Sequence, residues 1–199
     1  MALCSDKRIL GEEKLLAMAK AAKGKIANIF LHWTAGAYGH CYDDYHFCID
    51  RDGTFEIPAG RDIHALELVL AHTWRRNTGG VGIAIEAARG AKAKNPDDEG
   101  IEVEWGKQAV PTPEQFDGLA RSVAIICYGA DIPLHPDFVM THAEIADTDG
   151  YGIFDSDPEM KWDLFKYPGV RGDIGSALRQ KAQNYLEALK KGGYPWKTA

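Results

Sequence analysis

The sequence contains no Cys-x-x-Cys pair, and this absence removes the usual basis for predicting a zinc site built from four thiolates. Its four cysteines stand apart along the chain, at Cys4, Cys41, Cys48 and Cys127. A disulfide between Cys41 and Cys48 is the alternative if the protein works in an oxidising compartment. We expect buried free thiols instead, because the sequence shows no signal that would direct it there.

A secretory signal is also missing, since neither a basic nor an apolar stretch follows Met1. No apolar run approaches the roughly 20 residues that a membrane-spanning helix needs. We therefore expect a protein that is cytoplasmic as synthesised and that has no membrane partner. Action elsewhere would require release by a route that uses no such signal.

The sequence also lacks an excess of positive charge. The chain carries 23 Lys and Arg residues against 29 Asp and Glu residues, which gives a formal net charge of -6. Bulk attraction to phosphate is therefore not expected, and we predict no nucleic-acid partner. The 199 residues, 45% of them hydrophobic, are enough for one soluble domain with a sizeable core, and no repeat or low-complexity linker divides them.

The spacing of apolar residues predicts alternating helices and strands. Segments with the composition of strands are 26–33, 45–50, 55–57, 81–86 and 138–141. Segments with helical spacing are 12–23, 112–128 and 176–191. We predict a single α/β domain in which helices flank a central mixed β-sheet. Residues 1–25 form an N-terminal helical extension, and residues 26–199 form the functional domain.

Local motifs indicate where some elements begin and end. Thr112 is an expected N-cap, with Pro113 at the first helical position and Gln115 completing a capping box. Gly129 is the expected end of that helix. The charged segment 87–110, punctuated by Gly and Pro, is expected to be an exposed loop or a short excursion from the fold.

Two histidines end apolar runs that have the composition of buried strands. His32 follows Ile29–Leu31, and His142 follows Phe138–Thr141. Strands of one sheet can bring such histidines together at its rim, and a catalytic zinc site needs three protein ligands and one position open to water. Downstream carboxylates that are available as the third ligand are Glu144, Asp147, Asp149, Asp155, Asp157 and Asp163.

Further motifs follow one another along the chain. They are HWTA at 32–35, YHF at 45–47, RDGT at 51–54, AGRD at 59–62, AH at 71–72, Asn77, GVGI at 80–83 and THAE at 141–144. This ordered series resembles the type 2 N-acetylmuramoyl-L-alanine amidases, a family that includes phage endolysins, bacterial wall and recycling amidases, and peptidoglycan recognition proteins. The resemblance implies that residues 26–199 are a zinc amidase catalytic domain.

The resemblance also implies a ligand set for Zn²⁺: His32, His142 and a third residue in a Lys-x-Asp or Lys-x-Cys pattern. The segment from Lys161 to Asp163 fits that pattern. Asp163 is then the preferred third ligand, and Lys161 is the residue that stabilises oxygen charge in the tetrahedral state. Asp157 is the alternative ligand, because the Asp-Pro sequence there also resembles the ligand segment of the family.

The resemblance also implies a group that accepts a proton from the zinc-bound water or orients that water. One branch of the family places a tyrosine before the His-Phe of the second strand, which Tyr45 matches. Another branch places a glutamate at the position of Ala84 in this chain, so Glu86 is the available substitute on the same strand face. By strict alternation we expect Tyr45 on the same face as Phe47 and Ile49.

Residues His72 and Asn77 match positions along the substrate groove of the family, and Trp33 and Trp74 are candidates for stacking on sugar or peptide. The implied reaction is hydrolysis of the amide between the lactyl group of muramic acid and L-alanine, with peptidoglycan or a muropeptide as substrate. We expect a monomer that resembles a lytic phage or prophage endolysin, released to act on the cell wall. The alternatives are a non-catalytic peptidoglycan-binding module and a cytoplasmic muropeptide-recycling amidase.

Overall fold

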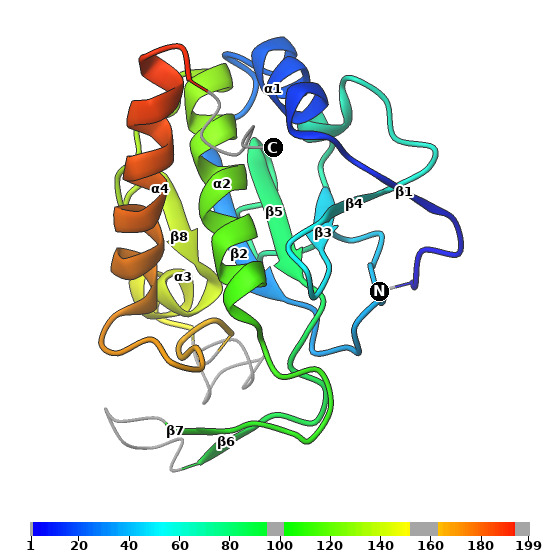
Figure 1. Ribbon diagram of the computed structural model, residues 1–199, viewed down its shortest axis with the longest axis vertical. Helices are drawn as coiled ribbons and strands as arrows, with labels where there is room; N and C mark the ends of the chain where they lie inside the picture. Colours follow the sequence, from blue (N-terminus) through cyan, green and yellow to red (C-terminus); the bar gives the residue numbers. More distant parts are fainter. Residues whose placement is uncertain (1, 95–101, 152–162, 194–199) are drawn as a thin grey trace.

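The computed structural model describes residues 2–94, 102–151 and 163–193, and its centre is a mixed β-sheet covered by helices (Figure 1). This architecture confirms the predicted α/β class. The strands are β1 (Lys7–Ile9), β2 (Asn28–Trp33), β3 (Phe47–Ile49), β4 (Phe55–Pro58), β5 (Gly80–Ile85), β6 (Lys92–Lys94), β7 (Glu102–Glu104) and β8 (Val139–Thr141). The helices are α1 (Glu12–Ala21), η1 (Ala65–Glu67), α2 (Pro113–Ala130), α3 (His142–Thr148) and α4 (Ile174–Lys190).

The six-stranded sheet has the order β1-β4-β3-β5-β2-β8. Strand β2 pairs in parallel with both β5 and β8, whereas β4 pairs antiparallel with β3 and β1. Leu31 is in register with Thr141 across the β2–β8 pair. The next residue of each strand is a histidine, so the register brings His32 and His142 to the same edge of the sheet.

The two faces of the sheet are covered differently. Helices α1, α2 and α4 lie together over one face, and α2 packs against both of the others (Figure 1). Ile29, Leu31 and Trp33 belong to the core on that side. Phe30 belongs instead to a smaller apolar cluster on the opposite face, together with residues of α3. Because side chains alternate along a strand, His32 faces the same side as Phe30, away from the three-helix layer.

Gly129 does not end helix α2, and this prediction was wrong. The helix continues to Ala130, and Asp131, with a left-handed φ of 61°, is the C-cap. A Cβ atom at position 129 would lie 2.6 Å from the Cβ of Ala19 in α1. This glycine therefore allows close helix contact rather than a helix stop. The predicted start is confirmed, because Thr112 and Gln115 form the capping box.

The expected alternation from residue 45 to residue 50 was also wrong in part. Only Phe47–Ile49 is a regular strand, and the backbone N–H of Tyr45 closes a turn with the carbonyl of Tyr42 at 3.3 Å. Alternation holds only within the regular pleat. Tyr45 consequently packs with Cys48 rather than with Phe47.

The first 25 residues contain the predicted helix and an unpredicted strand. Helix α1 ends two residues before the expected limit, and β1 pairs with β4 at the edge of the sheet. The segment 87–110 makes the expected excursion: among its described residues, β6 and β7 form a small hairpin beyond the main sheet (Figure 1). In the described part of the chain, no helix is long and apolar enough to cross a membrane.

The cysteines are free thiols, as expected. Cys41, Cys48 and Cys127 are buried, and Cys4 is half-buried.

Candidate metal centre

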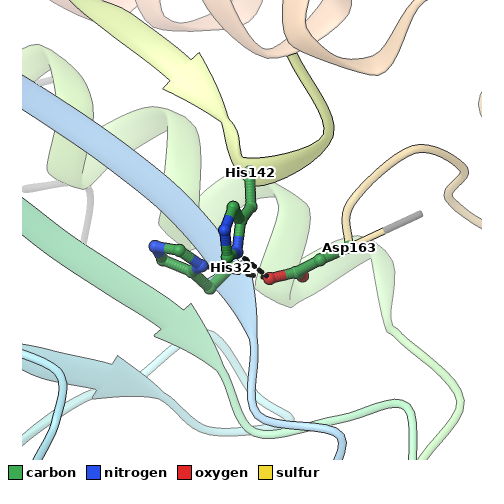
Figure 2. Close-up of side chains that lie close together, drawn as sticks. All are labelled: His32, His142 and Asp163. Carbon is green, nitrogen blue, oxygen red and sulfur yellow. Dashed lines mark hydrogen bonds and ion pairs between the residues drawn. The ribbon is translucent and has the colours of Figure 1, made fainter. Parts of the chain in front are cut away.

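Three side chains converge at the carboxyl edge of β2 and β8 (Figure 2). The Nδ1 atom of His32 lies 3.0 Å from Oδ2 of Asp163, and the Nδ1 atom of His142 lies 3.1 Å from the same oxygen. All three residues are buried. Segments that are far apart in the sequence thus place two imidazoles and one carboxylate around a common point.

The backbone next to each histidine holds Asp163 in position. Its second carboxylate oxygen, Oδ1, accepts a hydrogen bond from the N–H of Trp33 at 2.8 Å. Its carbonyl oxygen accepts another from the N–H of Ala143 at 3.0 Å. These two bonds fix the orientation of the carboxylate, so that Oδ2 faces both imidazoles.

A chain of polar contacts orients the imidazole of His32 from behind. Its Nε2 atom lies 3.3 Å from the hydroxyl of Thr73, and that hydroxyl lies 2.9 Å from Nδ1 of His72. His72 in turn contacts the carbonyl of Gly80 through Nε2 at 3.3 Å. A proton on Nε2 of His32 leaves Nδ1 free to bind a cation, which is how outer partners orient histidine ligands in metal sites.

His142 is positioned by the start of a helix. Thr141 is the N-cap of α3, and its capping box with Glu144 has both hydrogen bonds. Arg179 of α4 contacts Glu144 at 2.8 Å and the carbonyl of Val139 at 2.9 Å. This helix was not among the predicted elements, although the Thr-x-x-Glu pattern from 141 to 144 is the signal of a helix start.

The electrostatics of the group favour a bound cation. Burial lowers the pKa of His32, and the nearby His142 adds to that effect, although Asp163 opposes it. Burial alone would raise the pKa of Asp163, but hydrogen bonds with His142 and His32 lower it. The group therefore offers a neutral imidazole at His32 and an ionised carboxylate at Asp163.

The donor set also fits a metal ion by its chemistry. One nitrogen from each histidine and one carboxylate oxygen all lie within 4.8 Å of one another. Two nitrogens and an oxygen are the ligand types of a catalytic zinc site. The Nε2 atom of His142 is buried without a hydrogen-bond partner among the described residues, so that imidazole is not tied to another polar group on its far side.

Tyr45 lies beside this group. The centroid of its ring is 5.3 Å from that of His32, and its hydroxyl contacts the carbonyl of Trp33 at 3.5 Å. Burial raises the pKa of Tyr45 well above its ordinary value, and the charge of Asp163 raises it further. The phenol therefore stays protonated at neutral pH and can orient a water molecule through its hydroxyl.

Glu86 lies in a different group. It directly follows β5, and its carboxylate lies with the thiols of Cys41 and Cys48. Lys7 is 3.6 Å from one of its oxygens. Burial raises the pKa of Glu86 to about 8, and the neighbouring carboxylate of Glu56 contributes to the same shift.

The residues expected along the substrate groove make internal contacts. Asn77 accepts hydrogen bonds from the backbone N–H groups of His72 and Thr73, at 3.2 and 2.8 Å. The buried indole of Trp33 packs edge-on against Trp105, with centroids 5.5 Å apart. Contact of His72, Asn77 and Trp33 with substrate stays a prediction. Trp74, 43% exposed, presents a ring to solvent next to Tyr151.

Two expected site residues, Lys161 and the alternative ligand Asp157, lie outside the described residues.

The sequence matches a known protein family. A model of the N-acetylmuramoyl-L-alanine amidase family (Amidase_2) matches residues 22–160, which is more than half of the chain. No curated protein sequence matches it. Among solved structures, the chain is similar to the endolysin N-acetylmuramoyl-L-alanine amidase LysCS from Clostridium intestinale URNW. That similarity has 19% sequence identity and a TM-score of 0.39, and it covers 61% of this chain and 71% of that chain.

Proposed function

Because the chain belongs to the N-acetylmuramoyl-L-alanine amidase family, we propose that it uses Zn²⁺ to hydrolyse the amide between the lactyl group of muramic acid and L-alanine in peptidoglycan. The observation that carries the proposal is the convergence of His32, His142 and Asp163 on one point at the edge of the sheet. Asp163 lies just beyond the matched residues, so its place in the site rests on the geometry and on the Lys-x-Asp pattern.

The three residues have distinct tasks in this proposal. His32 and His142 supply neutral nitrogen ligands, and Asp163 supplies a negative charge that its two backbone hydrogen bonds keep in place. A zinc ion held by them lowers the pKa of a bound water toward neutrality and polarises the scissile carbonyl. Thr73 fixes the ring of His32 by contacting the nitrogen that faces away from Asp163.

We assign Tyr45 the role of orienting the water, since its ring adjoins that of His32. Glu86 is the weaker candidate for that role, because its carboxylate lies with Cys41 and Cys48. Lys161 is proposed to stabilise the developing oxygen charge, a role that rests on the resemblance alone.

In its biological setting, we propose a lytic, endolysin-like enzyme that acts as a monomer on the cell wall after release. The tyrosine before the His-Phe motif supports this assignment, because it matches one branch of the family. The acidic net charge of -6 argues against a nucleic-acid partner.

The test is digestion of purified peptidoglycan sacculi with the zinc-loaded protein, followed by mass spectrometry of the products. The expected products are free stem peptides with an N-terminal L-alanine and glycan chains that retain intact muramic acid lactyl carboxylates. The His142→Ala variant serves as the control and should release neither.

Two other results would indicate a different function. Binding of sacculi without any release identifies a peptidoglycan-binding module. Cleavage of soluble muropeptides alone, with intact sacculi left uncut, identifies a recycling amidase rather than a lytic enzyme.

A further inference from the structure

A second group of metal-binding side chains lies around the end of β5, separate from His32, His142 and Asp163. It contains Cys41 from the loop after β2, Cys48 from the middle of β3, and Glu86 directly after β5. One ligand atom of each lies within 4.8 Å of the other two. Two sulfurs of a tetrahedral zinc site lie roughly 3.7 Å apart, given Zn–S bonds near 2.3 Å, so only a small contraction is needed.

The backbone holds this group rigidly. Cys48 is in register with Ala84 across the β3–β5 pair, and the N–H of Glu86 continues that ladder by bonding to the carbonyl of Ile49 at 2.9 Å. The side-chain amide of Gln115 donates a hydrogen bond to the carbonyl of Glu86 at 3.1 Å. Two of the ligands are thus fixed by the sheet itself, which favours a preformed site.

The carboxylate of Glu86 is the observation that points to a cation. Its residue is 0% exposed, and neither carboxyl oxygen has a hydrogen bond of good geometry in the described part of the chain, although the carboxyl of Glu56 lies close enough to share a proton with it. The nearest positive charge is the ammonium of Lys7, at 3.6 Å, and Lys7 also pairs with Glu56 and donates to the carbonyl of Gly39. Burial and the neighbouring Glu56 raise the pKa of Glu86, so its ionised form is costly at this position unless a cation is bound, and a coordinated metal ion would remove that cost.

A third thiol adjoins the group from the N-terminal segment. The thiol of Cys4 hydrogen-bonds with that of Cys41, and the two backbones are joined by a hydrogen bond from the N–H of Cys4 to the carbonyl of Cys41 at 2.9 Å. Cys4 is half-buried, so it connects the group to solvent and provides an entry path. The thiol of Cys41 also hydrogen-bonds with that of Cys48, and it has weaker contacts of 3.9 Å with the carbonyls of Tyr42 and Glu56.

We propose that Cys41, Cys48 and Glu86, with Cys4 as fourth ligand, form a second metal site that binds a thiophilic divalent cation such as Zn²⁺. Three thiolates and one carboxylate complete a tetrahedral shell with no position open to water, which is the pattern of a structural site. Four anionic ligands around a divalent ion leave a net charge of about -2. The ammonium of Lys7 offsets part of that charge. The bound ion joins the N-terminal segment to β3 and β5, next to Tyr45.

Cobalt(II) separates the two sites by spectroscopy, because only a thiolate site gives sulfur-to-cobalt charge-transfer absorption in the near ultraviolet. The reduced, metal-free protein, verified to have four free thiols, is titrated with Co²⁺. We expect that absorption in the unsubstituted protein, in the Cys127→Ser variant, and in a His32→Ala/Asp163→Ala variant that lacks the other site. It should disappear in the Cys41→Ser/Cys48→Ser variant.

The number of zinc ions bound per chain provides a second test of this site. The Cys41→Ser/Cys48→Ser variant should hold about one zinc ion per chain where the unsubstituted protein holds about two, since the histidine site remains. The Cys127→Ser variant changes a buried thiol in helix α2 and should keep both ions.

If the double cysteine variant does not fold, the site can still be tested in the unsubstituted protein by measuring how strongly zinc protects its thiols from alkylation. In the unsubstituted protein, Zn²⁺ should slow alkylation of Cys41 and Cys48 at least tenfold while the rate at Cys127 is unchanged. Saturating cobalt without charge-transfer absorption, or equal alkylation with and without zinc, would overturn the second site. Neither result depends on amidase activity, so a failure here is distinct from a failure of the proposed function.

Discussion

Asp163 shows how one residue can serve both the fold and the site. Its carbonyl and one carboxylate oxygen bond to the backbone beside the two histidines, while its other oxygen faces their Nδ1 atoms. Loss of this side chain would remove the proposed third ligand and would leave the N–H of Trp33 without its acceptor. The residue is therefore expected to matter for metal binding and for local order.

The proposed role of Tyr45 in orienting the water can be tested by removing its hydroxyl group. Tyr45→Phe removes only the hydroxyl, so metal content and folding should persist while kcat falls by about 10- to 100-fold. Zinc analysis and steady-state rates on soluble muropeptides measure both quantities. Tyr42→Phe is the matched control and should keep the full rate. An unchanged kcat in Tyr45→Phe would remove Tyr45 from the mechanism.

Lys161 gives a second test of the reaction itself. Lys161→Ala should keep the zinc but lower kcat by roughly a hundredfold, because a positive charge no longer stabilises the developing oxyanion. Lys161→Arg retains the charge and should recover part of the rate. If Lys161→Ala loses metal instead, the residue supports the metal site rather than the transition state.

Some residues of the site could be predicted from the sequence. His32 and His142 end apolar runs and lie in specific motifs, so both could be identified from the chain alone. Thr73 could not, because its role depends on a turn that brings its hydroxyl to His32. The grouping of Cys41 and Cys48 with Glu86 could not be predicted either, since it arises from the pairing of β3 with β5.

Among the elements, the contact between α1 and α2 explains why the end of α2 was predicted at the wrong residue. A glycine is common after a helix, but Gly129 lies inside α2 where a Cβ would meet Ala19. Such a contact depends on two segments far apart in the chain, so no local pattern predicts it. The capping box at Thr112 is local, and it was predicted correctly.

This contact can be tested by substitution. Gly129→Ala should lower the free energy of unfolding by about 1–2 kcal/mol, because overpacking outweighs the better helix propensity of alanine. Adding Ala19→Gly should recover much of the loss, since it removes the facing methyl group. Chemical denaturation measures both variants. A more stable Gly129→Ala protein would show that the helices have room to separate.

The ion pair between Arg76 and Asp149 links the turn after His72 to the end of α3. The guanidinium contacts both carboxylate oxygens, at 2.6 and 2.5 Å. The hydrogen bonds from Arg76 lower the pKa of Asp149 below its ordinary value. The pair therefore stabilises the fold above the unfolded-state pKa of that carboxyl, and the effect is lost as pH falls through the folded-state pKa.

Arg76→Gln measures this contribution. At pH 7 the variant should be less stable by up to about 1 kcal/mol, the usual upper value for a partly exposed pair. The difference should shrink toward zero in strong acid, where the carboxyl is protonated in both states. Denaturation curves at several pH values test the trend, and a difference independent of pH would assign the effect to packing.

On the scale of the whole molecule, the parallel arrangement of β2, β5 and β8 creates the candidate site. Parallel neighbours place their carboxyl ends at one edge, so residues 110 positions apart in sequence meet there. The fold class follows from the alternation of helical and strand patterns. The edge strand β1 does not, because a three-residue strand carries too little pattern to recognise.

We propose that amide hydrolysis depends on a zinc ion bound by His32, His142 and Asp163. The most direct measurement compares zinc content and stem-peptide release in Asp163→Ala and Asp157→Ala. Asp163→Ala should hold one zinc ion fewer per chain than the unsubstituted protein and release no stem peptide, whereas Asp157→Ala should match the unsubstituted protein in both. Full zinc content and activity in Asp163→Ala, with their loss in Asp157→Ala, would show that Asp157 and not Asp163 is the third ligand.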